Sequence, residues 1–154
     1  MEQPRKIVFV CTGNTCRSPM AEAIARKLAE QAKVDVQFRS AGVATIDGLS
    51  MSEAAYHTLA EREIDGSEHV SKLLSEELLQ WADLVLTMTD QHRQVIDDRF
   101  PEYKNKIYNL SYYLYNKDIN IPDPYGGTLI IYRQCADVLE EMVRILVEKL
   151  QATH

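Results

Sequence analysis

The stretch that decides the fold runs from Lys6 to Ser18 and reads KIVFVCTGNTCRS: an apolar run, small residues, then an arginine. The apolar run is rich in β-branched residues, which predicts a strand buried on both faces. Ser18-Pro19 predicts the start of a helix, because proline favours the first helical position and serine is a good N-cap. The stretch therefore predicts a strand, a tight loop and a helix.

The rest of the chain repeats this alternation. Further strands are predicted at 34–38, 82–88 and 106–110. Further helices are predicted at 52–63, at 75–81, from a capping Asp90 to about Phe100, and at 128–150, with an irregular segment at 111–127. Solidly apolar strands that alternate with helices are typical of a doubly wound α/β fold with a parallel sheet. Ligands of such folds bind beyond the carboxyl ends of the strands, where the loop after the first strand lies.

The last predicted helix carries apolar residues in alternating steps of three and four. They are Leu129, Tyr132, Ala136, Leu139, Val143, Leu146 and Leu150. This spacing fits either a coiled-coil seam or a helix that lies on a sheet. We favour the second interpretation, because a parallel sheet needs both faces covered.

Length and composition exclude several classes of protein. The 154 residues fit one compact domain, and the net charge of −6 argues against non-specific binding to nucleic acid or anionic membranes. No apolar stretch approaches a membrane span, and residues 1–6 lack the apolar segment of a signal peptide. The chain has three cysteines, Cys11, Cys16 and Cys135. An odd number of cysteines suggests a protein of the reducing cytoplasm, without a framework of disulfides.

The loop at 11–18 has the chemistry of a phosphate site. A loop that enters a helix N-terminus offers backbone N–H groups and a positive dipole end to an anion. Gly13 and Asn14 tolerate unusual dihedral angles, and Arg17 offers a planar guanidinium that grips two phosphoryl oxygens. Cys11 would lie beneath the anion, and such surroundings predict a pKa lowered to roughly 3.5–7.5, as for a nucleophilic thiolate.

Other interpretations of the loop are weaker. A Walker loop would need a following Gly-Lys-Ser/Thr, and zinc would need a second close pair of cysteines or histidines. We therefore expect no zinc site. Cys16 is either a small packed side chain or the partner of an oxidised Cys11 in a reversible disulfide, and we favour the redox role.

The loop, Ser40-Ala41-Gly42, residues 82–89 and Asp123-Pro124-Tyr125 together resemble the low-molecular-weight protein tyrosine phosphatase family. The resemblance covers essentially all of residues 1–154 as a single domain. It implies a flavodoxin-like fold with a four-stranded parallel sheet, helices on both faces and a phosphate-binding loop after the first strand. It also implies no metal and no other cofactor.

The resemblance also implies roles for individual residues. Cys11 would be the nucleophile, Arg17 the phosphate clamp and Asp123 the general acid, which the chemistry needs because the leaving group departs poorly unless it is protonated. Asp123 has the alternative of a simple turn former, since Asp-Pro and Gly-Gly mark turns. The phosphate-binding loop would comprise Thr12, Gly13, Asn14, Thr15, Cys16 and Ser18, with Asn14 holding its shape and Ser18 bonded to the thiolate.

Thr15 is the residue that bears most on which substrate the protein accepts. Members of the family that act on phosphotyrosine tend to have an aliphatic residue there, and CTGNTCRSPMAE resembles the bacterial arginine phosphatases. A threonine hydroxyl can hydrogen-bond a guanidinium that an isoleucine would only desolvate. Tyr125 is a second substrate contact, although an aromatic face stacks with either group. We predict a protein arginine phosphatase that opposes a protein arginine kinase, acts as a cytoplasmic monomer and binds neither nucleic acid nor membrane.

Three alternatives to this function are a tyrosine phosphatase of the same family, an arsenate reductase and a thiol redox sensor. A reductase would need further cysteines on a mobile segment, and a sensor would not need Asp123. A sugar-uptake phosphocarrier, a further alternative, would need neither Arg17 nor an acid.

Overall fold

The computed structural model describes residues 3–152. The strands are β1 (Lys6–Cys11), β2 (Gln37–Gly42), β3 (Leu84–Thr87) and β4 (Ile107–Asn109). The helices are α1 (Arg17–Ala32), α2 (Glu53–Ala60), α3 (Glu76–Trp81), α4 (Asp90–Arg99), a 3-10 helix (Pro101–Lys106), α5 (Leu110–Tyr115) and α6 (Leu129–Gln151).

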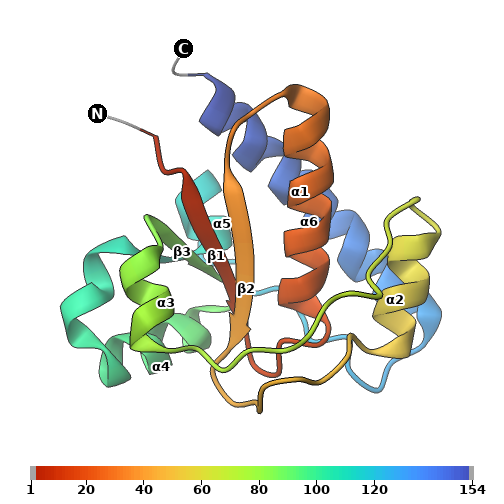
Figure 1. The fold of residues 1–154 in the computed structure, drawn as a ribbon, viewed down its shortest axis with the longest axis horizontal. Coiled ribbons are helices and arrows are strands. Elements are labelled where there is room, and N and C mark those ends of the chain that lie inside the picture. Colours follow the sequence, from red (N-terminus) through yellow and green to blue (C-terminus); the bar gives the residue numbers. More distant parts are fainter. Residues whose placement is uncertain (1–2, 153–154) are drawn as a thin grey trace.

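The four strands form one parallel sheet in the order β2-β1-β3-β4. The chain leaves β1 toward β2 on one side and later returns to place β3 on the other side (Figure 1). The carboxyl end of β1 is therefore the point where the strand order reverses, which is where ligands bind in doubly wound sheets. Cys11 is the last residue of this strand.

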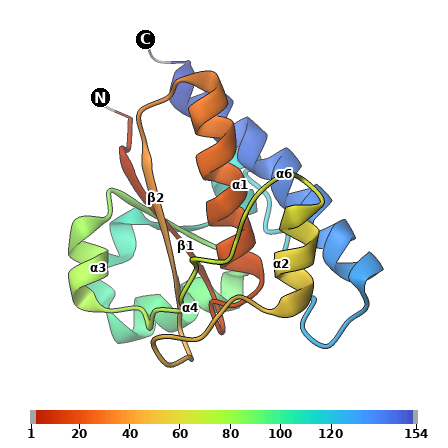
Figure 2. The same ribbon diagram turned by 45° about the vertical axis from the view of Figure 1, so that its right-hand side comes forward.

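Alternate residues of β1 enter two different cores. Ile7 and Phe9 pack with α1, α2, α5 and α6, whereas Val8 and Val10 pack in the core that includes Leu79 of α3 and Ile96 of α4. Figure 2 shows α1 and α6 side by side on one face of the sheet, with α3 and α4 on the other. The predicted four-stranded parallel sheet with helices on both faces is confirmed.

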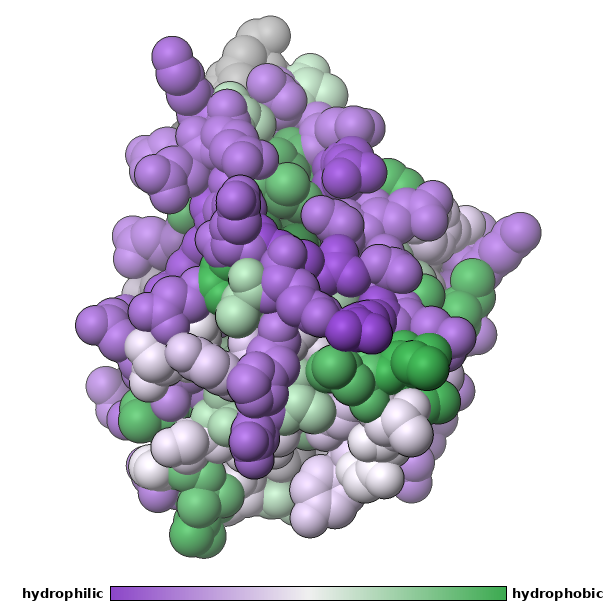
Figure 3. All heavy atoms as spheres, turned by 90° about the vertical axis from the view of Figure 1, so that its right-hand side faces the viewer, coloured by the Kyte–Doolittle hydropathy of each residue, from purple (hydrophilic) through white to green (hydrophobic). Residues whose placement is uncertain are grey.

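The amphipathic face of α6 lies in the core against α1 and α2, as we expected from the sheet-covering interpretation. Its buried residues include Tyr132, Ala136, Leu139, Val143, Leu146 and Leu150. The face of the molecule that comes forward in Figure 3 is mainly hydrophilic, with separate apolar areas. Among residues 3–152, no helix is both long and apolar enough to cross a membrane.

Several local predictions were wrong. Helix α1 begins at Arg17 with Cys16 as its N-cap, so Ser18 lies inside the helix and its hydroxyl bonds to the loop instead. Thr89, rather than Asp90, caps α4. The strand predicted at 34–38 lies at 37–42, and the segment predicted as irregular begins with α5.

Candidate active site

The thiol of Cys11 lies at the bottom of the loop and is buried. Its Sγ is 2.9 Å from the Ser18 hydroxyl and accepts a hydrogen bond of 3.3 Å from the backbone N–H of Asn14. A Cβ atom added to Gly42, on the neighbouring strand, would lie only 2.5 Å from the carbonyl oxygen of Thr12. Glycine at this position lets the loop fold back against the end of β2.

Asn14 connects the loop to distant segments. Its backbone has a φ of 57°, in the left-handed region that asparagine tolerates better than most residues. Its side-chain amide donates to Ser18 at 2.8 Å and to Ser40 at 2.9 Å. Its Oδ1 accepts from the backbone N–H of Lys72 at 2.9 Å, and the ring of His69 is 2.8 Å from its carbonyl oxygen. A single residue thus fixes the loop to β2 and to the segment before α3.

The guanidinium of Arg17 is held at the edge of the loop. The side chain is buried and donates at 2.9 Å to the carbonyl oxygen of Ile121. Its second terminal nitrogen is 3.5 Å from the Thr12 hydroxyl and 3.5 Å from a carboxylate oxygen of Asp123. The structure therefore brings the predicted arginine and the predicted acid together from opposite ends of the sequence.

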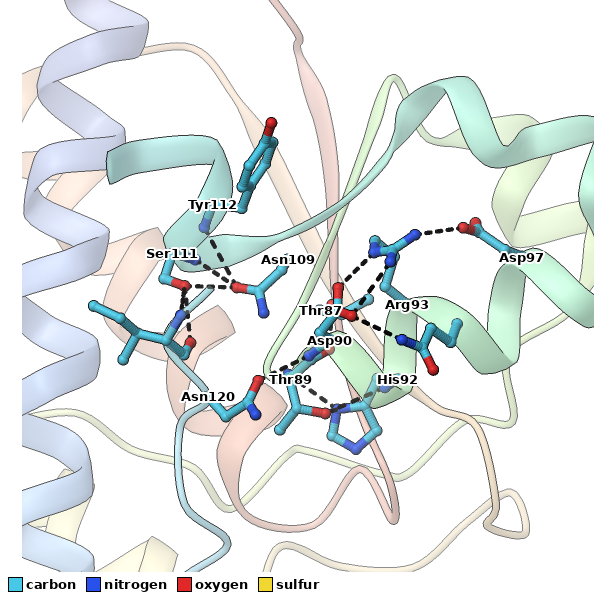
Figure 4. A network of polar contacts seen from close by, with 12 residues as sticks. Thr87, Thr89, Asp90, His92, Arg93, Asp97, Asn109, Ser111, Tyr112 and Asn120 are labelled. Atoms are coloured by element: carbon cyan, nitrogen blue, oxygen red, sulfur yellow. Dashed lines mark hydrogen bonds and ion pairs between the residues drawn. The ribbon is translucent and has the colours of Figure 1, made fainter. Parts of the chain in front are cut away.

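The segment that carries Asp123 is anchored shortly before that residue. The hydroxyl of Ser111 bonds to the backbone of Ile119, and Asn120 accepts a bond of 2.9 Å from the first N–H of α4 (Figure 4). The N–H of Ile121 donates to Met88 beyond β3 at 3.0 Å. The carboxyl group of Asp123 itself is half-exposed and accepts from the N–H of Tyr125.

The pKa of the Cys11 thiol is raised, whereas the sequence predicted that it would be lowered. Burial is the largest cause and disfavours the thiolate. The hydrogen bonds from Ser18, the charge of Arg17 and the N–H of Asn14 act in the opposite direction. The prediction was wrong because the loop sequence reveals the donors but not how deeply β1 places the sulfur.

The remaining predicted residues differ in their exposure. Thr15 is half-buried, and Tyr125 is 76% exposed. Cys16 is buried, 3.2 Å from the hydroxyl of Tyr132 on α6. Cys11, Cys16 and Cys135 are all free thiols. The part of the chain that the structure describes holds no group of three or more metal-ligating side chains.

Two histidines of the site, His69 and His92, were not predicted from the sequence, and both contact the loop. His92 is 6% exposed and its Nε2 is 2.8 Å from the Thr12 hydroxyl, while its Nδ1 faces Thr89 at the start of α4. No motif signals either contact, because each joins segments more than fifty residues apart.

The buried ring of His92 makes stability depend on pH. Burial, followed by the charge of Arg17, lowers its pKa from 6.5 to about 4. Between these values the unfolded chain binds a proton that the folded chain does not, so stability is full above pH 6.5 and falls as the pH falls toward 4. From pH 7 to pH 5 we expect a loss of about 2 kcal/mol from this group.

Urea unfolding at the two pH values measures this loss. The matched control is His92→Asn, which has no group that titrates in this range. An equal loss of stability in the two proteins would contradict the assignment.

Residues 6–154 match the family model described as low molecular weight phosphotyrosine protein phosphatase. The protein-arginine-phosphatase of Bacillus subtilis is 45% identical over 94% of this chain and 96% of its own length. The low molecular weight protein-tyrosine-phosphatase PtpB of Staphylococcus haemolyticus is 41% identical over 87% of this chain and 91% of its own length. A solved structure of the YwlE arginine phosphatase, a mutant with a phosphorylated active-site serine, has a TM-score of 0.94, 43% identity and 97% coverage of both chains.

Proposed function

This chain belongs to the low molecular weight phosphotyrosine protein phosphatase family, and from this premise we propose that it hydrolyses phosphoarginine in proteins through a phosphocysteine intermediate on Cys11. The observation that carries the proposal is the convergence of a thiol, a buried guanidinium and a carboxylate on one loop. Phosphoryl transfer depends mainly on positioning and charge stabilisation, and this arrangement supplies both.

In the first step, Cys11 loses its proton to solvent and attacks phosphorus as the thiolate. The contacts from Ser18, Asn14 and Arg17 reduce the cost of that ionisation. A sulfur–phosphorus bond forms while the bond from phosphorus to the guanidine nitrogen breaks. Asp123 gives its proton to that nitrogen, so that the arginine side chain departs in its protonated, stable form.

In the second step, water attacks the phosphocysteine. Asp123, now a carboxylate, accepts a proton from the water as the oxygen–phosphorus bond forms. The sulfur–phosphorus bond breaks, inorganic phosphate leaves and the thiolate is regenerated. Arg17 and the backbone N–H groups of the loop stabilise the charge on the phosphoryl oxygens in both steps.

A relative supports the covalent step. The active-site serine of the YwlE mutant carries a phosphate, which fits attack on phosphorus by the side chain at that position. Cys11 ends strand β1 at the start of the loop, where such an attack is possible.

Thr15 supports arginine as the substrate. Its carbonyl oxygen accepts a bond of 3.0 Å from the N–H of Ser52, so the backbone at the rim is fixed. Its half-buried hydroxyl is 3.8 Å from the sulfur of Cys16 and stays available to a guanidinium. The relatives named protein-arginine-phosphatase in Bacillus subtilis and Geobacillus stearothermophilus, 45% and 43% identical, support the same substrate.

Phosphotyrosine is the second candidate substrate. The Staphylococcus haemolyticus relative named a tyrosine phosphatase is 41% identical, and the exposed Tyr125 can stack on a phenyl ring as well as on a guanidinium.

We infer that a protein arginine kinase supplies the substrate. We further propose that the chain acts as a monomer, since Cys11, Arg17 and Asp123 all come from one chain. Its three free cysteines support a location in the reducing cytoplasm.

Replacing Thr15 by isoleucine tests the substrate assignment. We expect kcat/KM for a phosphoarginyl peptide to fall by about 10- to 100-fold, because the guanidinium loses a hydrogen-bond partner. We expect kcat/KM for the matched phosphotyrosyl peptide to stay the same or rise. Thr15→Ser, which keeps the hydroxyl, is the control and should retain most of the arginine activity. If the ratio of the two kcat/KM values is the same in Thr15→Ile as in the wild-type protein, the role assigned to Thr15 is wrong.

A further inference from the structure

His92 is a buried side chain of the site that the proposed mechanism does not use. It lies in the first turn of α4, opposite its partner Thr89 (Figure 4). The ring has contacts on both nitrogens: Nδ1 is 3.2 Å from the backbone nitrogen of Thr89 and 3.0 Å from its hydroxyl oxygen, and Nε2 is 2.8 Å from the hydroxyl of Thr12. Thus one ring joins the cap of α4 to the phosphate-binding loop.

The two contacts decide which nitrogen carries the hydrogen. The backbone N–H of Thr89 can only donate, and the Thr89 hydroxyl, which accepts from the backbone N–H of His92, can donate its own hydrogen to the ring, so both groups are satisfied when Nδ1 of His92 accepts. A neutral imidazole has one N–H, which is therefore on Nε2. The ring consequently donates to the oxygen of Thr12 rather than accepting from it.

The direction of this bond determines where the Thr12 hydroxyl points. Its oxygen accepts from His92, and the guanidinium of Arg17 donates to it at 3.5 Å. A hydroxyl has two acceptor sites and one hydrogen, so both acceptor sites are occupied and the hydrogen is turned away from both donors. Thr12 is exposed, and the same guanidinium nitrogen contacts Asp123. The hydrogen is therefore available to a group bound between the loop and Asp123.

We propose that His92 is a positioning residue that holds the Thr12 hydroxyl as a hydrogen-bond donor to a phosphoryl oxygen of the substrate during transfer to Cys11. This inference rests on the proposed function and adds a donor to the Arg17 guanidinium and the loop amides. Hydrogen-bond donors that are already in place stabilise the charge of the transition state strongly, because they need not reorient during the reaction.

The charges around His92 support this arrangement. Burial and then the charge of Arg17 lower the pKa of the ring, and Asp123 raises it, with a resulting pKa of about 4. The ring is therefore neutral at pH 7. A protonated ring would point an N–H at the N–H of Thr89, and Nδ1 would lose its role as an acceptor.

Two substitutions separate the contacts of His92. Asparagine places an oxygen near the position of Nδ1 and keeps the cap of α4, but does not reach Thr12. Glutamine places an amide nitrogen near the position of Nε2 and keeps the donor to Thr12. With a phosphoaryl ester we expect His92→Asn to lower kcat about tenfold with little change in KM, and His92→Gln to restore most of the loss.

A double-mutant cycle with Thr12→Val tests whether His92 acts through Thr12. We expect His92→Asn to cost about tenfold in the parent and almost nothing when Thr12 is valine. Equal losses in both backgrounds, or Asn and Gln variants that are equally slow, would overturn the proposal. Thermal unfolding of each variant identifies any that are impaired by misfolding.

A measurement without turnover separates this inference from the proposed function. The ring-nitrogen NMR spectrum of the wild-type protein at pH 7 should show a neutral imidazole with its hydrogen on Nε2. A hydrogen on Nδ1 would overturn the inference even in an active phosphatase. A wild-type protein without phosphatase activity would instead refute the proposed function, whatever the spectrum shows.

Discussion

Cys11→Ser is expected to abolish turnover, with kcat falling by at least about 10⁴-fold. The serine hydroxyl ionises far less readily than a thiol and is a poorer leaving group in the second step. The hydroxyl would occupy the position that lies 2.9 Å from the Ser18 hydroxyl and next to the Asn14 N–H. We therefore expect the variant to bind substrate normally and to accumulate phosphoserine slowly.

Phosphate release and intact-protein mass spectrometry measure the two effects. Cys135→Ala is the matched control, since Cys135 is a buried thiol on α6 outside the loop. It should retain full activity. A serine variant that turns over substrate at more than about one per cent of the wild-type rate would exclude Cys11 as the nucleophile.

Asp123→Asn is expected to give the second largest loss. An amide cannot protonate the departing nitrogen, so kcat for phosphoarginyl peptides should fall by about 10²- to 10⁴-fold. An aryl phosphate with a stable leaving group needs less protonation, so its first step should be affected less. Hydrolysis of the phosphoenzyme should be slowed for both substrates, because Asp123 is also the base.

Rapid mixing with the aryl phosphate resolves the two steps. We expect a burst of released aryl alcohol followed by a slow phase, with phosphocysteine present in the quenched enzyme. Asp118→Asn is the control, because Asp118 is an exposed carboxylate on the same segment. Equal effects of the two substitutions, or a loss that does not depend on the leaving group, would show that Asp123 is not the acid.

The sequence predicted the parts of the site that are local in the chain. Strand β1, the loop and helix α1 are continuous, and their roles depend on residue types at short spacing, from Cys11 to Arg17. The prediction that Asp123 acts together with the loop came from the family resemblance. The distance of 3.5 Å between the Arg17 and Asp123 side chains gives it a structural basis.

Contacts between segments that are distant in the chain could not be predicted from the sequence. His69 and His92 reach the loop from the segment before α3 and from α4, and neither has a signature in the residues around it. Ser18 was predicted as an N-cap because Ser-Pro is typical of helix starts. In the structure its hydroxyl contacts Cys11 and Asn14, and the helix begins at Arg17, two residues earlier than predicted.

The redox role of Cys16 stays a prediction. Its thiol is 3.2 Å from the Tyr132 hydroxyl and 3.4 Å from that of Ser52, so these contacts would change if a disulfide formed with Cys11. Burial, followed by the bond to Cys16, raises the pKa of Tyr132 to about 12, so its hydroxyl stays protonated and able to donate.

The central claim is that this chain is a phosphatase for phosphoarginine. The most direct test is the ratio of kcat/KM values of the wild-type enzyme for two peptides of the same sequence, one with phosphoarginine and one with phosphotyrosine. We expect a ratio of at least about ten in favour of phosphoarginine, because phosphoarginine satisfies a polar group that phosphotyrosine leaves unpaired. A ratio of one or less would contradict it.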